Sequence, residues 1–199
     1  MSGAPTSGAD RSAGQLPHAE ALARAGWCDM ELTWEQAQEA AAEALETGDW
    51  EAAAALWAAG LELAGTTFEA GDPRLATSLA NRAVALRRAG ADAAALFDEA
   101  LAVWARSDPW VLALAPERRA RSATYHLRLE TRYPGGYDRH ARARHAALAE
   151  EGRTALEALR AGGGTARGSL ARWRRERPAG FVDLRKLLAA VLLLADPVD

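Results

Sequence analysis

Four histidines and one cysteine are the residues of this chain most suited to chemistry, and their spacing argues against catalysis. His140 and His145 are five residues apart, which places them about 140° apart around a helix rather than on one face. No His-Glu-x-x-His motif, cysteine pair or carboxylate cluster completes a metal site beside them. Cys28 has only Arg24 as a basic neighbour, so we interpret it as a packed, unreactive thiol. We predict a non-enzymatic protein with no catalytic residue, no cofactor and no bound metal.

Two further features could bind ligands but have simpler interpretations. The glycines at 162–164 lack the preceding strand and the following lysine of a phosphate-binding loop. Among the seven tryptophans, Trp50, Trp57 and Trp104 fall at the spacing of helical core positions. We expect these three side chains to pack in the core rather than to stack on a ligand.

The composition predicts an all-α protein with helix in more than about half of its residues, well above the usual share of roughly a third. The 199 residues contain no isoleucine and are dominated by the helix formers Ala, Leu, Arg and Glu. A single cysteine excludes an internal disulfide, and no signal peptide is apparent, which together favour a cytoplasmic location. The longest uncharged apolar run, at 187–195, is far shorter than the ~20 residues that span a bilayer. We therefore expect no transmembrane segment.

Charge is distributed unevenly behind a net charge of −3. Residues 29–72 contain eleven acidic residues and no Lys or Arg, whereas 116–146 contain eight Arg and 167–186 contain seven basic residues. Such runs are most often solvated helix faces. The asymmetry also favours an acidic partner for the C-terminal half, or head-to-tail self-association.

Start and stop signals divide the middle of the chain into helices. Asp72 and Pro73 form one start, with an N-cap carboxylate and a proline at the first helical position. Thr33 and Gln36 have the spacing of a capping box, which indicates another start. The expected helices are 34–46, 50–64, 73–90, 92–105, 117–132 and 137–161.

Turn glycines recur at nearly fixed spacing. They lie at Gly48, Gly90 and Gly135, 42 and 45 residues apart. Each would join two helices into a hairpin that cannot bury its apolar face alone, so three stacked hairpins are expected.

The stretch LETGDWEAAAALWAAGLEL resembles the turn and second helix of a tetratricopeptide repeat (TPR). Gly48, Trp50, Ala53, Trp57 and Leu61 stand where that family has Gly, an aromatic, Ala, an aromatic and Leu. The stretch DPRLATSLANRAVALRRAG is similar to the first helix of the longer-period repeats of kinesin light chain-like proteins. The spacing also fits HEAT or armadillo repeats of roughly 40–47 residues, but the Gly-x-aromatic turn favours the TPR-like interpretation.

The resemblance covers 34–159 and weakens along the chain. It implies a short right-handed α-solenoid of about three hairpins, whose concave groove binds another protein or a peptide. Carried over by motif position, it assigns these groove residues: Asn81, Arg88, Tyr125, His126 and Arg132, together with Glu35, Gln38, Glu39, Ala42, Thr77, Val84, Ser122 and Leu129. Asn81 matches one Asn of the family's carboxylate clamp, whereas the first repeat has Gln38 and Ala42 at the clamp's Lys and Asn positions. The arginines, Tyr125 and His126 are expected to converge on one surface at the basic end of the groove.

The segments outside the hairpins complete the predicted organisation. We expect a disordered tail at 1–16, a repeat domain at 17–161, a flexible linker at 162–169 and a basic, amphipathic helical segment at 170–199. The last segment has a wide apolar face, which favours a cap folded back over the last hairpin. The alternatives are docking to a partner, to a second copy as a homodimer, or to an anionic membrane.

Two functions from different classes remain at this point. The first, which we favour, is a protein-interaction adaptor or assembly chaperone that binds a peptide or a partner helix. The second is a nucleic-acid-binding helical module that uses the arginine-rich stretches. A negative net charge and the absence of a recognisable reading motif weigh against it.

Overall fold

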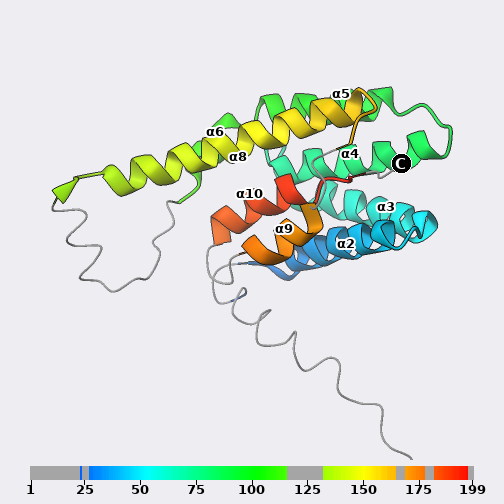
Figure 1. Cartoon of the computed structure of the whole chain (residues 1–199), viewed down its shortest axis with the longest axis horizontal. Coiled ribbons are helices and arrows are strands. Elements are labelled where there is room, and N and C mark those ends of the chain that lie inside the picture. The colour runs from blue at the N-terminus through cyan, green and yellow to red at the C-terminus, as the bar shows by residue number, and fades with distance from the viewer. Residues whose placement is uncertain (1–22, 24–26, 116–131, 165–168, 178–181, 197–199) are drawn as a thin grey trace, which may run out of the picture.

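A computed structural model describes residues 23, 27–115, 132–164, 169–177 and 182–196 of the chain. These residues form eight helices and no strand, and the helices comprise more than half of the whole chain, as predicted. In chain order they are α2 (Asp29–Glu46), α3 (Trp50–Thr67), α4 (Pro73–Arg88), α5 (Ala94–Ala105), α6 (Asp108–Ala113), α8 (Gly136–Arg160), α9 (Ser169–Glu176) and α10 (Val182–Leu192) (Figure 1).

The first two predicted hairpins are present as the pairs α2/α3 and α4/α5, and α3 packs against α4. The turn glycines Gly48 and Gly90 have φ of +79° and +77°, a conformation that glycine adopts without steric cost. The turns use the same hydrogen bonds: the glycine amide donates three residues back, and the next amide donates five residues back. This is the Schellman motif that ends a helix cleanly. Gly135 also has a positive φ, +66°, at the start of α8.

Of the two predicted helix-start signals, one is confirmed and the other is wrong. The Asp72 carboxylate accepts a hydrogen bond from the Arg74 amide at 2.9 Å, with Pro73 opening α4. Thr33 does not cap α2, because the helix already begins at Asp29. Its hydroxyl instead donates to the Asp29 carbonyl inside the helix. The cap comes from Glu31, whose carboxylate accepts from the Cys28 amide at 3.1 Å, so Cys28 lies exposed at this end and not in the core.

The third predicted hairpin is described only in its second helix. The helix expected at 117–132 lies almost entirely outside the described residues, as do the predicted tail at 1–16 and half of the predicted linker. The described helix is α8, which packs against α4, α5, α6 and α10. Its N-terminal part extends beyond the rest of the bundle (Figure 1). Its C-terminal end is held by Arg87 of α4, whose guanidinium donates to the Leu159 carbonyl at 2.6 Å.

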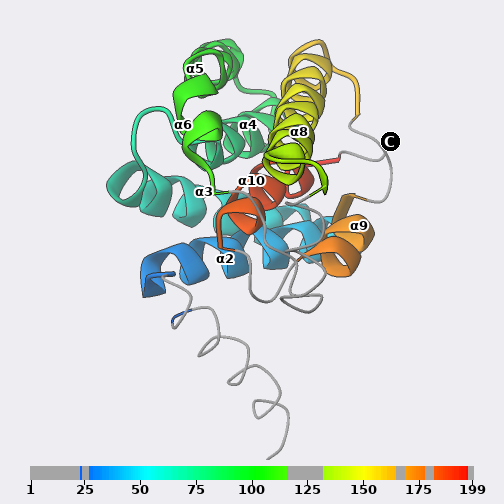
Figure 2. The same cartoon turned by 90° about the vertical axis from the view of Figure 1, so that its left-hand side faces the viewer.

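The C-terminal helices fold back onto the earlier ones. Viewed along the helices, α10 lies inside the bundle, with α4 and α8 on one side, α2 on the other and α9 beside it (Figure 2). Leu187, Leu188, Ala189 and Ala190 have no exposed surface. The apolar face predicted for this segment is therefore covered by the chain's own helices.

Tryptophan and small residues make the core close-packed. Trp57 and Trp104 are buried, as predicted, whereas Trp50 is only partly buried; Trp34 and Trp173 are also buried. A Cβ atom on Gly152 of α8 would lie 2.4 Å from the Trp104 ring, so this glycine allows α8 to approach α5. Gly60 does the same between α3 and α2, where the added carbon would meet Gln38.

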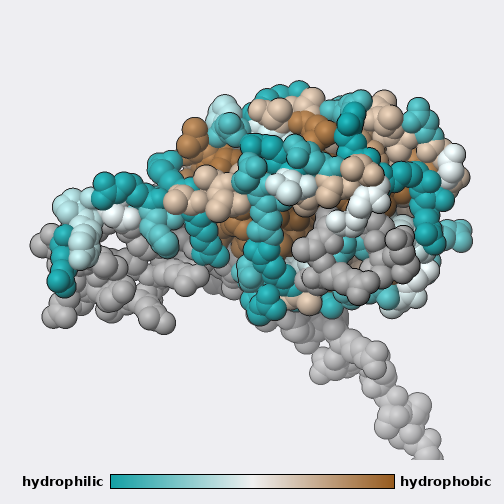
Figure 3. Space-filling model, turned by 45° about the horizontal axis from the view of Figure 1, so that its top comes forward, coloured by the Kyte–Doolittle hydropathy of each residue, from teal (hydrophilic) through white to brown (hydrophobic). Residues whose placement is uncertain are grey.

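Polar side chains dominate much of the face shown in Figure 3, and apolar areas are small and interrupted. The large apolar residues with the most exposed surface are Leu112, Tyr133 and Met30. Within the described ranges, no helix is both long and apolar enough to cross a bilayer.

Candidate functional site

The candidate site is a face formed by α2 and α4, which we call the docking face. Its residues are Glu31, Glu35, Gln38, Glu39 and Glu43 on α2 and Thr77 and Asn81 on α4. In this structure it is covered by the C-terminal segment, by which we mean α9, α10 and residues 193–196. The sequence had assigned several of these residues to a groove for a partner.

Carboxylates at every fourth residue make one stripe along α2, because residues four apart share a helix face. The Lys186 ammonium lies 2.7 Å from the Glu31 carboxylate, and the Arg185 guanidinium donates hydrogen bonds to both carboxylate oxygens of Glu35. Arg177 lies 2.7 Å from Glu39. The α2 helix therefore meets its basic partners in reverse order of sequence.

The stripe ends at Arg174 of α9, which contacts two carboxylates. Its Nε lies 3.6 Å from Glu39, and its Nη2 pairs closely with Glu43. From Glu31 to Glu43 the basic partners thus run from Lys186 back to Arg174. The order along α9 matches its direction, which is opposite to that of α2, whereas α10 runs in the same direction as α2 (Figure 1).

Burial changes along this stripe. The Glu35 and Arg185 side chains are 5% and 2% exposed, whereas those of Glu43 and Arg174 are 55% and 43% exposed. Exposed pairs contribute about 0–1 kcal/mol each and are screened by salt. A buried pair contributes chiefly by fixing one arrangement, since loss of either partner leaves a charge without compensation.

A second buried cation supports the buried end of the stripe. The Arg74 guanidinium of α4 donates three hydrogen bonds to the Asp72 carboxylate, two from Nε at 3.1 Å and one from Nη2 at 2.6 Å, and a fourth to Glu31 at 3.0 Å. Its guanidinium lies 3.9 Å from the centre of the Phe68 ring. Arg185 lies between two indoles, 5.5 Å from the ring centre of Trp27 and 5.4 Å from that of Trp173. Aromatic faces thus replace water around both guanidinium groups.

The two buried carboxylates respond differently to this environment. Burial would raise the pKa of Glu31, but the hydrogen bond from Lys186 and the charge of Arg74 outweigh it, so its pKa lies below the ordinary value. Burial raises the pKa of Glu35, and pairing with Arg185 offsets only part of that effect. The first carboxylate is therefore held as an anion more firmly than the second.

Polar side chains of α4 bind the main chain of the C-terminal segment. The Thr77 hydroxyl donates to the Ala190 carbonyl at 2.6 Å. The Asn81 amide donates to the Leu193 carbonyl at 2.8 Å and accepts from the Ala195 amide at 2.7 Å. The same amide donates to Gln38 of α2 at 2.8 Å, which ties the two helices of the face together. Main-chain contacts of this kind do not depend on the sequence of the bound segment.

The structure places the predicted site residues apart from one another. Asn81 lies on the docking face, but its side chain is fully buried and used within the chain. Arg88 is exposed and stacks on Trp50, with 4.5 Å to the ring centre. Arg132 is exposed beside Tyr133 at the other end of the molecule. Tyr125 and His126 lie outside the described residues.

The expected convergence of the two arginines is wrong. Arg87, the neighbour of Arg88, contacts the C-terminal end of α8, whereas Arg132 precedes the N-terminal end of that helix. A helix of 25 residues is about 37 Å long at 1.5 Å per residue. The length of α8 therefore separates Arg88 from Arg132.

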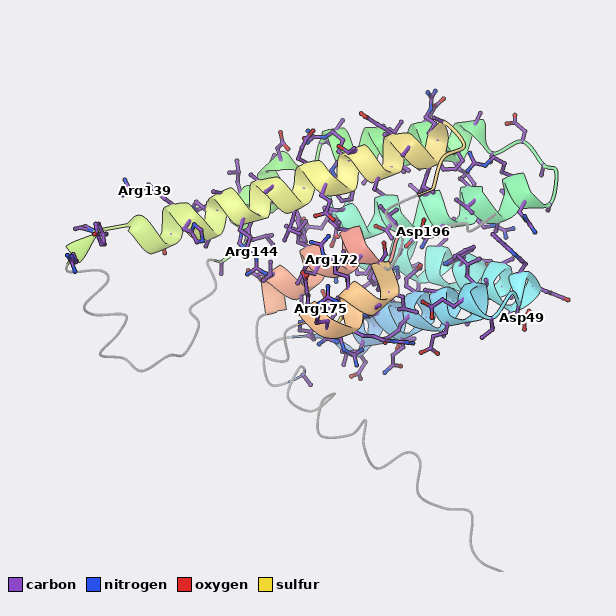
Figure 4. All side chains as sticks on the ribbon, viewed as in Figure 1. Asp49, Arg139, Arg144, Arg172, Arg175 and Asp196 are labelled. Atoms are coloured by element: carbon purple, nitrogen blue, oxygen red, sulfur yellow. The ribbon has the colours of Figure 1, made fainter. Side chains whose placement is uncertain are left out.

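Most arginines of the C-terminal segment are engaged by carboxylates. Arg172 pairs with Glu151 of α8, and the hydrogen bond from that pair raises the pKa of the guanidinium. Figure 4 shows Arg172 and Arg175 on α9 and Arg139 and Arg144 on the projecting part of α8. Phosphate groups would have to compete with these internal pairs on α9, which disfavours it as a nucleic-acid surface in this conformation.

The spacing of the acidic stripe was visible in the sequence, but its partner was not. Glu31, Glu35, Glu39 and Glu43 recur at helical spacing, and the sequence indicated an acidic counterpart for the basic segment. That counterpart is α2 of the same chain. Among the described residues, no group of His, Cys, Asp and Glu has the arrangement of a metal site.

Comparison with protein-family models, with curated proteins and with solved structures gives no match for this chain.

Proposed function

We propose that this chain is a TPR-like protein-interaction module, an adaptor or assembly chaperone, that binds a partner helix on the docking face. In this proposal α2/α3 and α4/α5 are the first two hairpins of a short right-handed solenoid, and α8 belongs to the third. The partner is a basic amphipathic helix, because the face is acidic along α2. The adaptor needs no catalytic chemistry.

The observation that carries the proposal is the way the face holds the C-terminal segment. Carboxylates of α2 bind its basic side chains, while Thr77 and Asn81 of α4 bind its main chain. A helix that served only as core packing would need neither polar row, since burying polar groups gains little over apolar packing. Side-chain pairing combined with main-chain capture is the usual logic of peptide recognition.

Competition from the chain itself sets the affinity for any partner. When only a fraction of the molecules has an open face, the observed dissociation constant rises in inverse proportion to that fraction. Weakening the exposed pair at Glu43 and the partly exposed pair at Glu39 should open the face without disturbing its buried end.

The test uses a fluorescent peptide with the sequence of residues 169–196 as the probe. We expect it to bind the full chain carrying Arg174→Glu and Arg177→Glu about tenfold more tightly than the wild-type chain, corresponding to roughly 1.4 kcal/mol. Fluorescence anisotropy at several salt concentrations measures the difference. The matched control is Glu150→Arg on the exposed surface of α8, which should leave binding at the wild-type level.

If the peptide does not bind the chain that carries Arg174→Glu and Arg177→Glu, which we call the loosened chain, the proposal is contradicted. Random-sequence DNA and RNA are tested in the same assay. Binding of these probes with a steep loss at higher salt, without peptide binding, would favour the nucleic-acid function instead.

A further inference from the structure

We infer that the partner helix is the C-terminal segment of a second copy of this chain, so that two copies exchange their segments and form a closed dimer. This inference rests on the proposed function and names its occupant. Each copy would supply the docking face for the other, with Arg174, Arg177 and Arg185 crossing between chains.

The contacts themselves require no change for this exchange. Every bond between the docking face and the segment joins residues far apart in sequence, 150 residues for Glu35 and Arg185 and 131 for Glu43 and Arg174. A second copy presents the same side chains and main-chain groups in the same order. The exchanged and closed forms therefore differ in the path of the connecting chain rather than in the interface.

The connection begins at a firmly held point. Arg87 binds the Leu159 carbonyl, and the Gly162 amide donates back to the same carbonyl at 3.1 Å. Gly162 has a φ of +89°, so the direction of the chain changes here at a residue that tolerates many backbone conformations. A break in direction at this point leaves α8 and its contacts intact.

The length of the connection permits both paths. Eight residues, 161–168, separate α8 from α9, and four of them are glycine. Fully extended, they reach about 26–29 Å. This length sets the largest separation between α8 and α9 that the connection can span in either form.

The order of the charges favours the C-terminal segment of a second copy over an unrelated basic helix as the partner of the docking face. The stripe on α2 consists of the carboxylates of Glu31, Glu35, Glu39 and Glu43. Their partners in the C-terminal segment are, in the same order, Lys186, Arg185, Arg177 and Arg174. Two copies satisfy both stripes at once with two-fold symmetry, which closes the assembly at a dimer.

Concentration governs the balance between the closed monomer and the exchanged dimer. A connection of eight residues holds the segment at an effective concentration in the millimolar range, so exchange between wild-type chains needs similar concentrations or transient opening. Reversing charge on one side of the pairing removes that advantage, because the chain's own segment is then repelled.

The experiment mixes two full-length variants. The face variant carries Glu39→Arg and Glu43→Arg, and the segment variant carries Arg174→Glu and Arg177→Glu. Each repels its own segment, but in an exchanged pair the reversed segment meets the reversed face and the two wild-type surfaces meet each other. We expect the mixture to form a heterodimer of twice the 21.2 kDa chain mass, at least tenfold tighter than self-association of either variant.

Native mass spectrometry and light scattering after size exclusion measure the masses. The control carries all four substitutions in one chain, which restores pairing within the molecule and should give a monomer. A mixture that remains monomeric, with both variants folded by circular dichroism, would overturn the inference.

A second measurement covers the case in which a variant does not fold. Wild-type chain and ¹⁵N-labelled wild-type chain are unfolded together, refolded at about 0.5 mM and analysed by native mass spectrometry. Mixed-label dimers support the exchange, and their absence overturns it. If the 169–196 peptide binds the loosened chain while copies fail to pair, the exchange fails but the proposed interaction module stands.

Discussion

The side-chain carbonyl of Asn81 accepts a hydrogen bond from the Ala195 amide at 2.7 Å, across 114 residues of sequence. The other end of the same side chain donates to Leu193. One amide group thus satisfies two main-chain groups just beyond the end of α10, where the helix no longer provides partners. Because these contacts are fully buried, water cannot replace them when they are lost.

Asn81→Ala is therefore expected to lower the free energy of unfolding by about 2–6 kcal/mol, since it leaves two buried main-chain groups unpaired and each costs about 1–3 kcal/mol. Chemical denaturation measures the loss, and hydrogen exchange should show early loss of protection at the Ala195 amide. Asn81→Asp retains the acceptor for Ala195 but not the donor for Leu193. If both substitutions left stability and exchange unchanged, the capture of the main chain would have no energetic role.

Thr77 offers a matched comparison on an adjacent turn of α4. Its hydroxyl bonds the carbonyl four residues back and also reaches Ala190 of α10. Thr66 on α3 makes only bonds within its own helix. We expect Thr77→Val to cost about 1–3 kcal/mol more than Thr66→Val in thermal or chemical unfolding. Equal costs would mean that the bond to α10 contributes nothing.

The buried pair of Glu35 and Arg185 predicts strongly non-additive mutations. Arg185→Met should cost about 3–5 kcal/mol, because Glu35 is left buried without its cation. Combining it with Glu35→Leu removes both charges and should recover part of that loss. A double-mutant cycle by urea denaturation measures the coupling. Additive effects would show that the two side chains do not act as a pair.

Gly152 predicts a steric effect of a single methyl group. Gly152→Ala would place a carbon 2.4 Å from the Trp104 ring and should lower stability by about 1–3 kcal/mol despite the better helix propensity of alanine. Gly65 on α3 has no atom within 4 Å of an added Cβ, so Gly65→Ala should raise stability by up to about 1 kcal/mol. Thermal unfolding of the two variants should move in opposite directions.

His145 predicts a loss of stability at mildly acidic pH. It is buried on α8, and burial, with Arg144 nearby, lowers the pKa of its imidazole below the ordinary 6.5. The unfolded chain then binds more protons than the folded one. Stability from this group is complete above pH 6.5 and is lost as the pH falls toward the lowered value, by up to about 1.4 kcal/mol per pH unit.

Unfolding curves between pH 5 and 8 test this expectation. His145→Leu should flatten the dependence in that window, whereas His140→Gln on the exposed surface should leave it unchanged. An identical pH profile for His145→Leu and the wild type would mean that another group is responsible.

Local features of the fold could be predicted because they depend on residues close in sequence. Gly48, Gly90 and Gly135 marked the turns because only a positive φ reverses the chain so sharply, and Asp72 with Pro73 marked a helix start. The start signal at Thr33 gave a wrong prediction because Glu31, two residues earlier, accepts a hydrogen bond from the Cys28 amide and caps the helix there. Two equally good local signals cannot be ranked without the packing of Trp27 and Trp34 around them.

The candidate site could be predicted only in part. Asn81, Glu35 and Glu39 were assigned to a groove for a partner, and in the structure all three contact the C-terminal segment. Their occupant depends on pairs more than 100 residues apart, for which no local spacing rule exists. The basic run at 172–177 and the stripe on α2 were each visible, but opposite charge alone does not say whether partners belong to one chain or to two.

The long separations within the ion pairs also determine when the docking face is covered during synthesis. The α2 carboxylates are made 131–150 residues before Arg174 and Arg185. At about 5–20 residues per second, this interval lasts roughly 7–30 s, far longer than the microseconds in which helices form. The hairpins can therefore form early, before the basic residues of the C-terminal segment that pair with the α2 carboxylates have been synthesised. On a polysome, where neighbouring nascent chains present the same surfaces, that delay is the period in which one molecule's segment can meet another molecule's face.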